Sequence, residues 1–212
     1  MFIKILILII LSLSAFSKEI KDVDFTGDID LVLGDFSKSN LEKVCNISYP
    51  PIYKFWQKNP TFTQYDILIC NESLIEYAQS LGFYEANISY EISEEKATLS
   101  IQKNKQIKIS SIDIEDEYKN IIGLNIDDFF NASDFTNSKK NIHKYLNEQG
   151  YPKAQLDAKA YVDIDEYKVD IVYKVEKNNL QYFGKVDIEN NANVDTEFLQ
   201  KEIEFKKGDK YN

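Results

Sequence analysis

The residues most open to covalent chemistry in this chain are its two cysteines, Cys45 and Cys70. Cys45 is in helical register with the apolar Leu41, and Cys70 with the apolar Leu74, so each lies on the inner face of a predicted helix. In an exported chain, such a pair is more often a disulfide than a redox site. The spacing therefore predicts a disulfide between two helices, and two reduced buried thiols are the alternative.

No set of side chains suited to catalysis stands out. His143 is the only histidine, and its lysine neighbours indicate the solvated side of a helix, which excludes a histidine-based triad or a multi-histidine metal site. The acidic pairs at Asp127–Asp128 and Asp163–Glu166 fall in predicted turns without the spacing and glycine of a calcium loop. We expect neither an enzyme nor a cofactor or metal site.

The charge balance restricts the partners. The chain has 35 acidic residues, 25 lysines and no arginine, which gives a net charge of −10. Such a surface repels phosphate backbones, so the sequence argues against nucleic-acid binding. No basic patch in the sequence favours adsorption to anionic lipid.

Residues 1–17 have the pattern of a secretory signal peptide. Lys4 precedes an apolar run, and small residues follow up to Ser17, after which we expect cleavage. The run is shorter than the ~20 residues of a spanning helix, so an uncleaved anchor is the weaker alternative.

A diverged repeat organises the rest of the chain. The stretch 81–115 recurs at 149–189, with Gly82-Phe83 matching Gly150-Tyr151, and the copies are offset by about 70 residues. A repeat of this length is a small domain with its own core. The predicted domains are 24–104, 106–178 and an incomplete third at 180–212, which indicates a piece of a longer protein.

Each copy follows the order β-α-α-β-β. In the second copy the glycine stop at Gly150 and the alternation after it predict a helix followed by a hairpin. Its expected elements are a strand over 107–115 with a possible bulge at Ser110-Ser111, one or two helical turns ending at Gly123, a helix capped by Ser133 or Asp134 and running to Gln149, and strands over 154–162 and 168–176. In the first copy they are a strand over 29–33, helices over 37–46 and 66–81, and a hairpin over 86–102. In the third they are a strand over 181–189, a helix capped by Asp195 and a turn over 207–211.

The connection between the first two helices, residues 48–63, is unusually aromatic. It has two interpretations. Its side chains form a flap that closes the small core of the first domain, which we favour slightly because a small domain needs its apolar residues inside. Alternatively they dock a partner protein. The partner-docking candidates are Tyr53, Phe55, Trp56 and Phe62.

A signal peptide followed by such units resembles the POTRA domains of the BamA/TamA superfamily, with a TamA-like number of units. The residues that carry the resemblance are Leu81-Gly82-Phe83-Tyr84-x-Ala86, Gln149-Gly150-Tyr151-x-x-Ala154 and Lys207-Gly208-x-x-Tyr211. The resemblance implies an α+β fold of tandem domains, each a three-stranded mixed sheet with two helices on one face.

The resemblance also implies a function. POTRA arrays extend into the periplasm of Gram-negative bacteria from a carboxy-terminal outer-membrane barrel, and assist insertion or translocation of proteins. We therefore expect an arm at the periplasmic face of the outer membrane that binds unfolded outer-membrane or secreted proteins, and a periplasmic or inner-membrane partner. Membrane contact is expected only through the barrel, which this sequence does not include.

In POTRA folds the second strand lies at a sheet edge, where an extended client can pair with its backbone. Alternatively, that edge is merely solvated or covered by the neighbouring unit. The candidate residues are Ala86, Ile88, Tyr90 and Ile92 in the first domain and Ala154, Leu156, Ala158, Ala160 and Val162 in the second. Two other functions remain open: a free-standing periplasmic scaffold, and the POTRA region of a two-partner secretion transporter.

Overall fold

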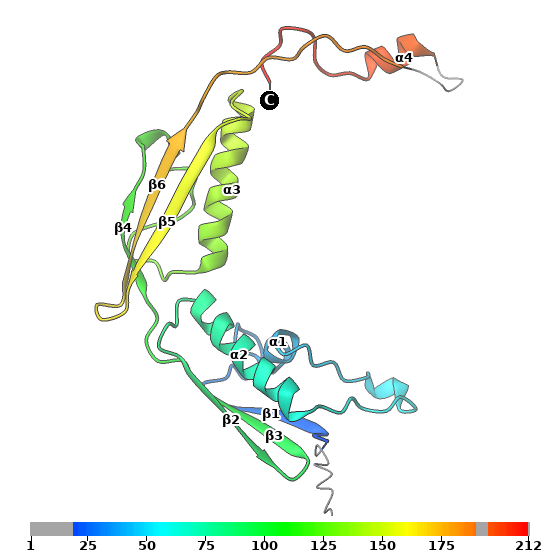
Figure 1. Ribbon diagram of the computed structural model, residues 1–212, viewed down its shortest axis with the longest axis vertical. Coiled ribbons are helices and arrows are strands. Elements are labelled where there is room, and N and C mark those ends of the chain that lie inside the picture. The colour runs from blue at the N-terminus through cyan, green and yellow to red at the C-terminus, as the bar shows by residue number, and fades with distance from the viewer. Residues whose placement is uncertain (1–18, 190–194, 212) are drawn as a thin grey trace, which may run out of the picture. The chain divides into compact units, whose positions relative to one another are not determined.

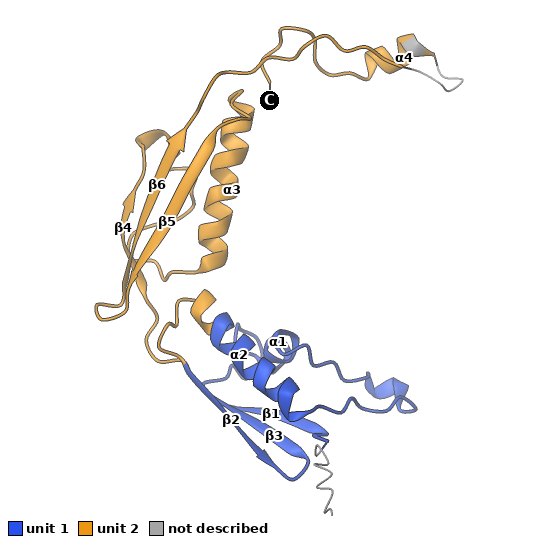
Figure 2. Ribbon diagram, viewed as in Figure 1, with its two compact units in different colours: residues 1–77, 87–102 blue, residues 78–86, 103–212 orange. Residues whose placement is uncertain are grey.

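The computed structural model describes residues 19–189 and 195–211, which fold as two compact units (Figures 1 and 2). Unit 1 comprises residues 1–77 and 87–102, and unit 2 comprises residues 78–86 and 103–212. The predicted signal peptide lies outside the described residues. Both units are α+β, with a three-stranded mixed sheet in each, as predicted.

In unit 1 the second strand of the hairpin, Lys96–Gln102, lies in the centre of the sheet. The sheet order is β1-β3-β2, with β1 parallel and β2 antiparallel to β3. Its elements are β1 (Asp22–Gly27), α1 (Lys38–Val44), the 3₁₀ turn η1 (Ile52–Lys54), α2 (Gln64–Ser80), β2 (Asn87–Ser93) and β3 (Lys96–Gln102). The helical connection returns the chain to the end of the sheet where β1 stops. Strand β2 then runs back along the sheet and the hairpin reverses the chain again, so β3 is parallel to β1.

The first strand lies earlier in the chain than the sequence predicted. The expected strand over 29–33 is wrong, because the backbone there forms a loop closed at its base by the hydrogen bonds of Asp30 and Phe36: Asp30 N–H donates to Phe36 O, and Phe36 N–H donates to the Asp30 carboxylate. The apolar tip of that loop, Leu31 to Leu33, is almost fully exposed. The true strand puts Val23 and Phe25 into the core instead.

The predicted disulfide between Cys45 and Cys70 is confirmed. It joins the residue that ends α1 to the middle of α2, and Cys70 is buried beside Ile67 and Leu74 on the inner face of that helix. The two helices of unit 1, α1 and α2, are thus fixed to each other covalently.

Unit 2 repeats the topology with the order β4-β6-β5. Its elements are β4 (Lys108–Asp113), the 3₁₀ turn η2 (Asp116–Tyr118), α3 (Ala132–Glu148), β5 (Gln155–Asp163), β6 (Lys168–Glu176) and α4 (Thr196–Lys201). Figure 1 shows α3 running along one face of this sheet. The one or two helical turns expected before Gly123 form the single 3₁₀ turn η2, and the loop from η2 to α3 covers the core together with α3.

The expected β-bulge in β4 is also confirmed. The register with β6 shifts between Ile109 and Ser111, which leaves Ser110 as the extra residue. The hydroxyls of Ser110 and Ser111 each lie 2.5 Å from the Asp170 carboxylate on β6. These hydrogen bonds lower the pKa of Asp170, so its charged form holds the bulge at neutral pH.

Helix α3 begins two or three residues earlier than expected. Asn131, and neither Ser133 nor Asp134, is the N-cap, and its side-chain oxygen accepts a hydrogen bond of 2.7 Å from the Ser133 N–H. The helix ends, as predicted, just before the left-handed Gly150.

The carboxy-terminal residues form little regular structure. The strand expected over 181–189 is wrong, since only an isolated bridge joins Tyr182 to Lys210. Asp195 caps α4 as predicted, accepting from the Glu197 N–H at 2.9 Å. That residues 180–212 begin a separate third domain stays a prediction.

A buried polar pair in unit 2 gives a first testable consequence. Ser138 on α3 is fully buried, its hydroxyl lies 2.5 Å from that of Tyr173 on β6, and it donates to Phe135 O. Ser138→Ala is expected to cost about 1–3 kcal/mol because the Tyr173 hydroxyl is then buried without this partner. Tyr173→Phe should cost less in the Ser138→Ala background than alone, and chemical denaturation of the four proteins of this cycle measures the difference. Additive costs would contradict the coupling.

Candidate functional site

Two strands, β2 and β5, lie at sheet edges and are the candidate client-binding strands. The ladder pairs show that β3 and β6 are central, so each candidate strand has a partner on one side only. Whether these edges bind an extended chain depends on which backbone groups they turn outward and whether anything covers them.

The direction of the backbone groups in β5 follows from the ladder of β6. Lys108 N–H donates to Tyr167 O at 3.1 Å, so odd-numbered residues of β6 face β4, and even-numbered residues such as Val172 face β5. Val172 lies opposite Lys159, which therefore turns its N–H and C=O toward β6. The even-numbered residues of β5 turn these groups to the outer edge; they are Leu156, Ala158, Ala160 and Val162.

The same reasoning holds for β2. Asp28 N–H donates to Ile101 O at 2.9 Å, so odd-numbered residues of β3 face β1 and even-numbered ones face β2. Thr98 is opposite Glu91, which leaves Ile88, Tyr90 and Ile92 with outward backbone groups. Within the described part of the chain, no backbone hydrogen bond reaches the outer side of β2 or β5.

The opposite edges of both sheets are partly covered by the chain itself. At the start of β4, the segment 127–130 runs beside the strand and exchanges hydrogen bonds with Ile107 and Ile109, including Ile109 N–H to Asp128 O at 2.9 Å. Just before β1, Ile20 and Phe62 exchange two backbone bonds of 2.8 and 2.7 Å. Each unit therefore has one partly covered edge and one open edge.

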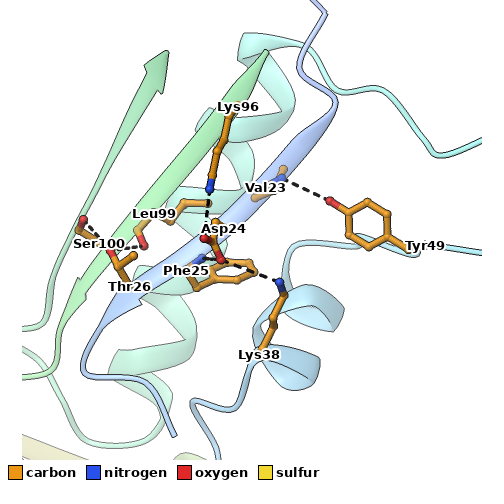
Figure 3. A network of polar contacts seen from close by, with 9 residues as sticks. All are labelled: Val23, Asp24, Phe25, Thr26, Lys38, Tyr49, Lys96, Leu99 and Ser100. Atoms are coloured by element: carbon orange, nitrogen blue, oxygen red, sulfur yellow. Dashed lines mark hydrogen bonds and ion pairs between the residues drawn. The ribbon is translucent and has the colours of Figure 1, made fainter. Parts of the chain in front are cut away.

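Side chains complete the closure of β1 (Figure 3). The outward Val23 N–H donates to the Tyr49 hydroxyl at 3.3 Å, and burial raises the pKa of that phenol, which keeps it neutral. The Asp24 carboxylate accepts from the Phe25 N–H at 3.0 Å and lies between Lys96 and Lys38, at 3.3 and 3.8 Å. Burial acts to raise the pKa of Asp24, but the hydrogen bonds and these cations outweigh it and lower the pKa.

Each open edge has one face turned to the core and one turned to solvent. In β5 the residues with outward backbone groups point half-buried side chains to the core side, whereas Asp157, Lys159 and Tyr161 are exposed on the other face. An added strand would thus extend an existing apolar layer on one face and meet charged groups on the other. Ala86 and Ala154 precede β2 and β5 by one residue and lie outside the strands.

The partner-docking candidates separate into two groups. The favoured interpretation of a core-closing flap is wrong for Tyr53, Phe55 and Trp56, whose exposed fractions are 70%, 87% and 67%. Phe62 is half-buried and pairs with Ile20, so its role is structural. The sequence could not separate them, because all four are aromatic residues in one connection.

The described residues do not bring together side chains that could hold a metal ion. His143 is exposed on α3, and no group of three metal-ligating side chains forms there. Among the helices that the structure describes, none has the length and hydropathy to cross a membrane.

Comparison with known proteins assigns the fold. Residues 103–178 match the family model of the POTRA domain, described as a surface antigen variable number repeat. They contain β4, α3, β5 and β6, so this part of unit 2 is a POTRA domain. None of the curated proteins matches the chain in sequence.

Solved structures extend the likeness to both units. The crystal structure of Haemophilus influenzae BamA POTRA3-5 has a TM-score of 0.54 and 18% identity, with 92% of this chain and 80% of that chain covered. POTRA1-2 of Anabaena Omp85 gives 0.40 and 14%, covering 76% and 96%. CdiB from Escherichia coli gives 0.37 and 6%, covering 76% of this chain but 28% of that one, so the chain spans about a quarter of its length. The fold is that of the POTRA domains of BamA.

Proposed function

We propose that this chain is the periplasmic arm of an outer-membrane protein assembly or translocation factor, and that it binds client polypeptides as added strands on β2 and β5. The observation that carries the proposal is the asymmetry of the sheets: each has one edge partly covered by its own chain and one edge without a backbone partner in the described residues.

Backbone pairing suits clients that differ in sequence. The outward N–H and C=O groups bind any extended segment, while the half-buried side chains of β5, small at Ala158 and Ala160, leave room for varied neighbours. The fold shared with BamA POTRA domains and the predicted signal peptide support the periplasmic location.

A proline pair in β5 tests the edge. Ala158→Pro removes an outward N–H, whereas Lys159→Pro removes an N–H that faces β6. With an alternating valine-threonine peptide as probe and a photo-crosslinker in place of Tyr161, Ala158→Pro is expected to reduce capture about fivefold or more, since a hydrogen bond contributes about 1 kcal/mol. Tyr90→Pro is the corresponding change on β2, read with a crosslinker in place of Glu91.

Two controls separate binding from folding. Ala158→Pro should keep the hydrogen-exchange protection of β6, and Lys159→Pro should lose part of it. The same peptide with alternate backbone nitrogens methylated should be captured poorly by the unaltered chain. Equal capture of the methylated peptide, or of the plain peptide by the Ala158→Pro chain with β6 still protected, would refute edge pairing.

A further inference from the structure

The connection between α1 and α2 has a composition unlike the rest of the chain. Residues 48–63 contain two lysines and no acidic residue, although the whole chain carries a net charge of −10. Three of the four prolines lie here, at Pro50, Pro51 and Pro60, as does the only tryptophan, Trp56. We call residues 50–60 the aromatic loop. Figure 1 shows it running out from the helices of unit 1 and back.

The tip of the aromatic loop exposes large apolar side chains. The exposed fraction is 98% for Ile52 and 87% for Phe55, and Phe55 contacts Trp56 edge to face with ring centroids 5.3 Å apart. With Tyr53, four exposed apolar or aromatic side chains thus lie within the five positions 52–56. Exposed apolar clusters of this kind mark binding to a membrane or a protein.

The other side of the loop is cationic. A shallow hollow of about 580 Å³ is lined by Tyr49, Pro51, Lys54, Gln57, Lys58 and Pro60, with two ammonium groups and no carboxylate. Ile52, Phe55 and Trp56 do not line it. One short segment thus combines an apolar tip with a positively charged hollow that suits a phosphate group.

Prolines and one turn shape the backbone of the loop. Each proline lacks an N–H, and within the turn Lys54 N–H donates to Pro51 O at 2.8 Å and Gln57 N–H donates to Lys54 O at 2.9 Å.

The sequence led us to expect membrane contact only through a barrel. The exposed tip and the two lysines lead to a different inference, and we propose that the aromatic loop binds a phospholipid surface, with Ile52, Phe55 and Trp56 at the boundary between headgroups and acyl chains, and Lys54 and Lys58 on lipid phosphates. Tryptophan and tyrosine favour that boundary, and lysine stems reach from it to the headgroups. The two lysines of the loop complement lipid phosphates. The net charge of −10 on the whole chain opposes this attraction little, because charges more than about 8 Å away are screened at physiological salt.

The single tryptophan makes the test direct. With vesicles of phosphatidylethanolamine and phosphatidylglycerol at physiological ionic strength, Trp56 emission is expected to shift to the blue, and brominated lipid should quench it. Because the quenching reports on residue 56 alone, lipid contact through residues 1–17 does not by itself produce it. Inorganic phosphate alone should leave the emission unchanged.

Variants separate the two parts of the loop. Ile52→Ser with Phe55→Ser should weaken vesicle binding roughly tenfold or more while keeping Trp56 as reporter. Lys54→Gln with Lys58→Gln should weaken it roughly tenfold or more on these vesicles and less on vesicles of phosphatidylcholine.

The matched control is the other exposed apolar loop. Leu31→Ser with Leu33→Ser removes side chains as exposed as those of the aromatic loop but flanked by acidic residues, so it should leave Trp56 quenching unchanged. Absence of a blue shift, or equal loss in this control, would overturn the proposal. So would a shift that needs no vesicles and grows with protein concentration, because it would assign the loop to a protein interface. None of these outcomes bears on edge pairing at β5.

Discussion

Replacing Cys45 and Cys70 together by alanine is expected to lower the free energy of unfolding of unit 1 by about 3 kcal/mol, because the closed loop of 25 residues restricts the unfolded chain. The effect is large for a small domain whose first helix, α1, has only 7 residues and one buried side chain, Leu41. A helix so short depends on tertiary contacts for its stability.

Hydrogen exchange can measure this for each unit separately. In the double variant, the buried strand β3 of unit 1 should lose protection by about two orders of magnitude, which corresponds to that free energy. The amides of β6 serve as the internal control, because both cysteines belong to unit 1. Unchanged protection of β3 would show that packing alone holds α1 against α2.

Gly82→Ala is expected to destabilise unit 2 by about 2–4 kcal/mol. Gly82 has φ of +87°, which disfavours any side chain, and a Cβ there would lie 2.5 Å from the backbone oxygen of Phe130. Its own carbonyl accepts the Ile107 N–H at 3.0 Å, so the residue cannot shift without losing the entry into β4.

Gly123 provides the matched control. Its φ is +69°, but a Cβ there would meet nothing within 4 Å, so Gly123→Ala should cost only the backbone term of about 1 kcal/mol. Denaturant unfolding of both variants, followed in unit 2, measures the difference. Equal losses would mean that conformation, and not the contact with Phe130, makes glycine necessary at residue 82.

The two glycine-aromatic steps show which structural features neighbouring residues are sufficient to predict. Gly82 and Gly150 each end a helix in the left-handed conformation, and alternation after each predicts a hairpin with one buried face, which β5 and β6 have. The bulge at Ser110 and the disulfide followed from side-chain periodicity in the same way. These features depend on neighbours in the chain, so the order of residues is sufficient to predict them.

The first strand was misplaced because alternation alone does not decide between competing segments. Residues 29–33 alternate as well as Val23 and Phe25 do, but Gly27 turns the chain and Asp30 closes a loop with Phe36. Which segment reaches β3 depends on contacts with residues about seventy positions away.

The sequence alone therefore determined the α+β class, the repeat, the glycine stops of two helices and the cysteine pair, because periodicity and glycine chemistry act over a few residues. Only the tertiary structure decided which edges are open and which aromatic residues are exposed. Segment 127–130 covers β4 and Phe62 pairs with Ile20, while Trp56 remains outside, and these outcomes depend on backbone groups that meet across the fold. Edges and exposed loops carry the proposed functions because hydrogen-bonding groups and apolar surface left unpaired by folding are the ones available to a partner.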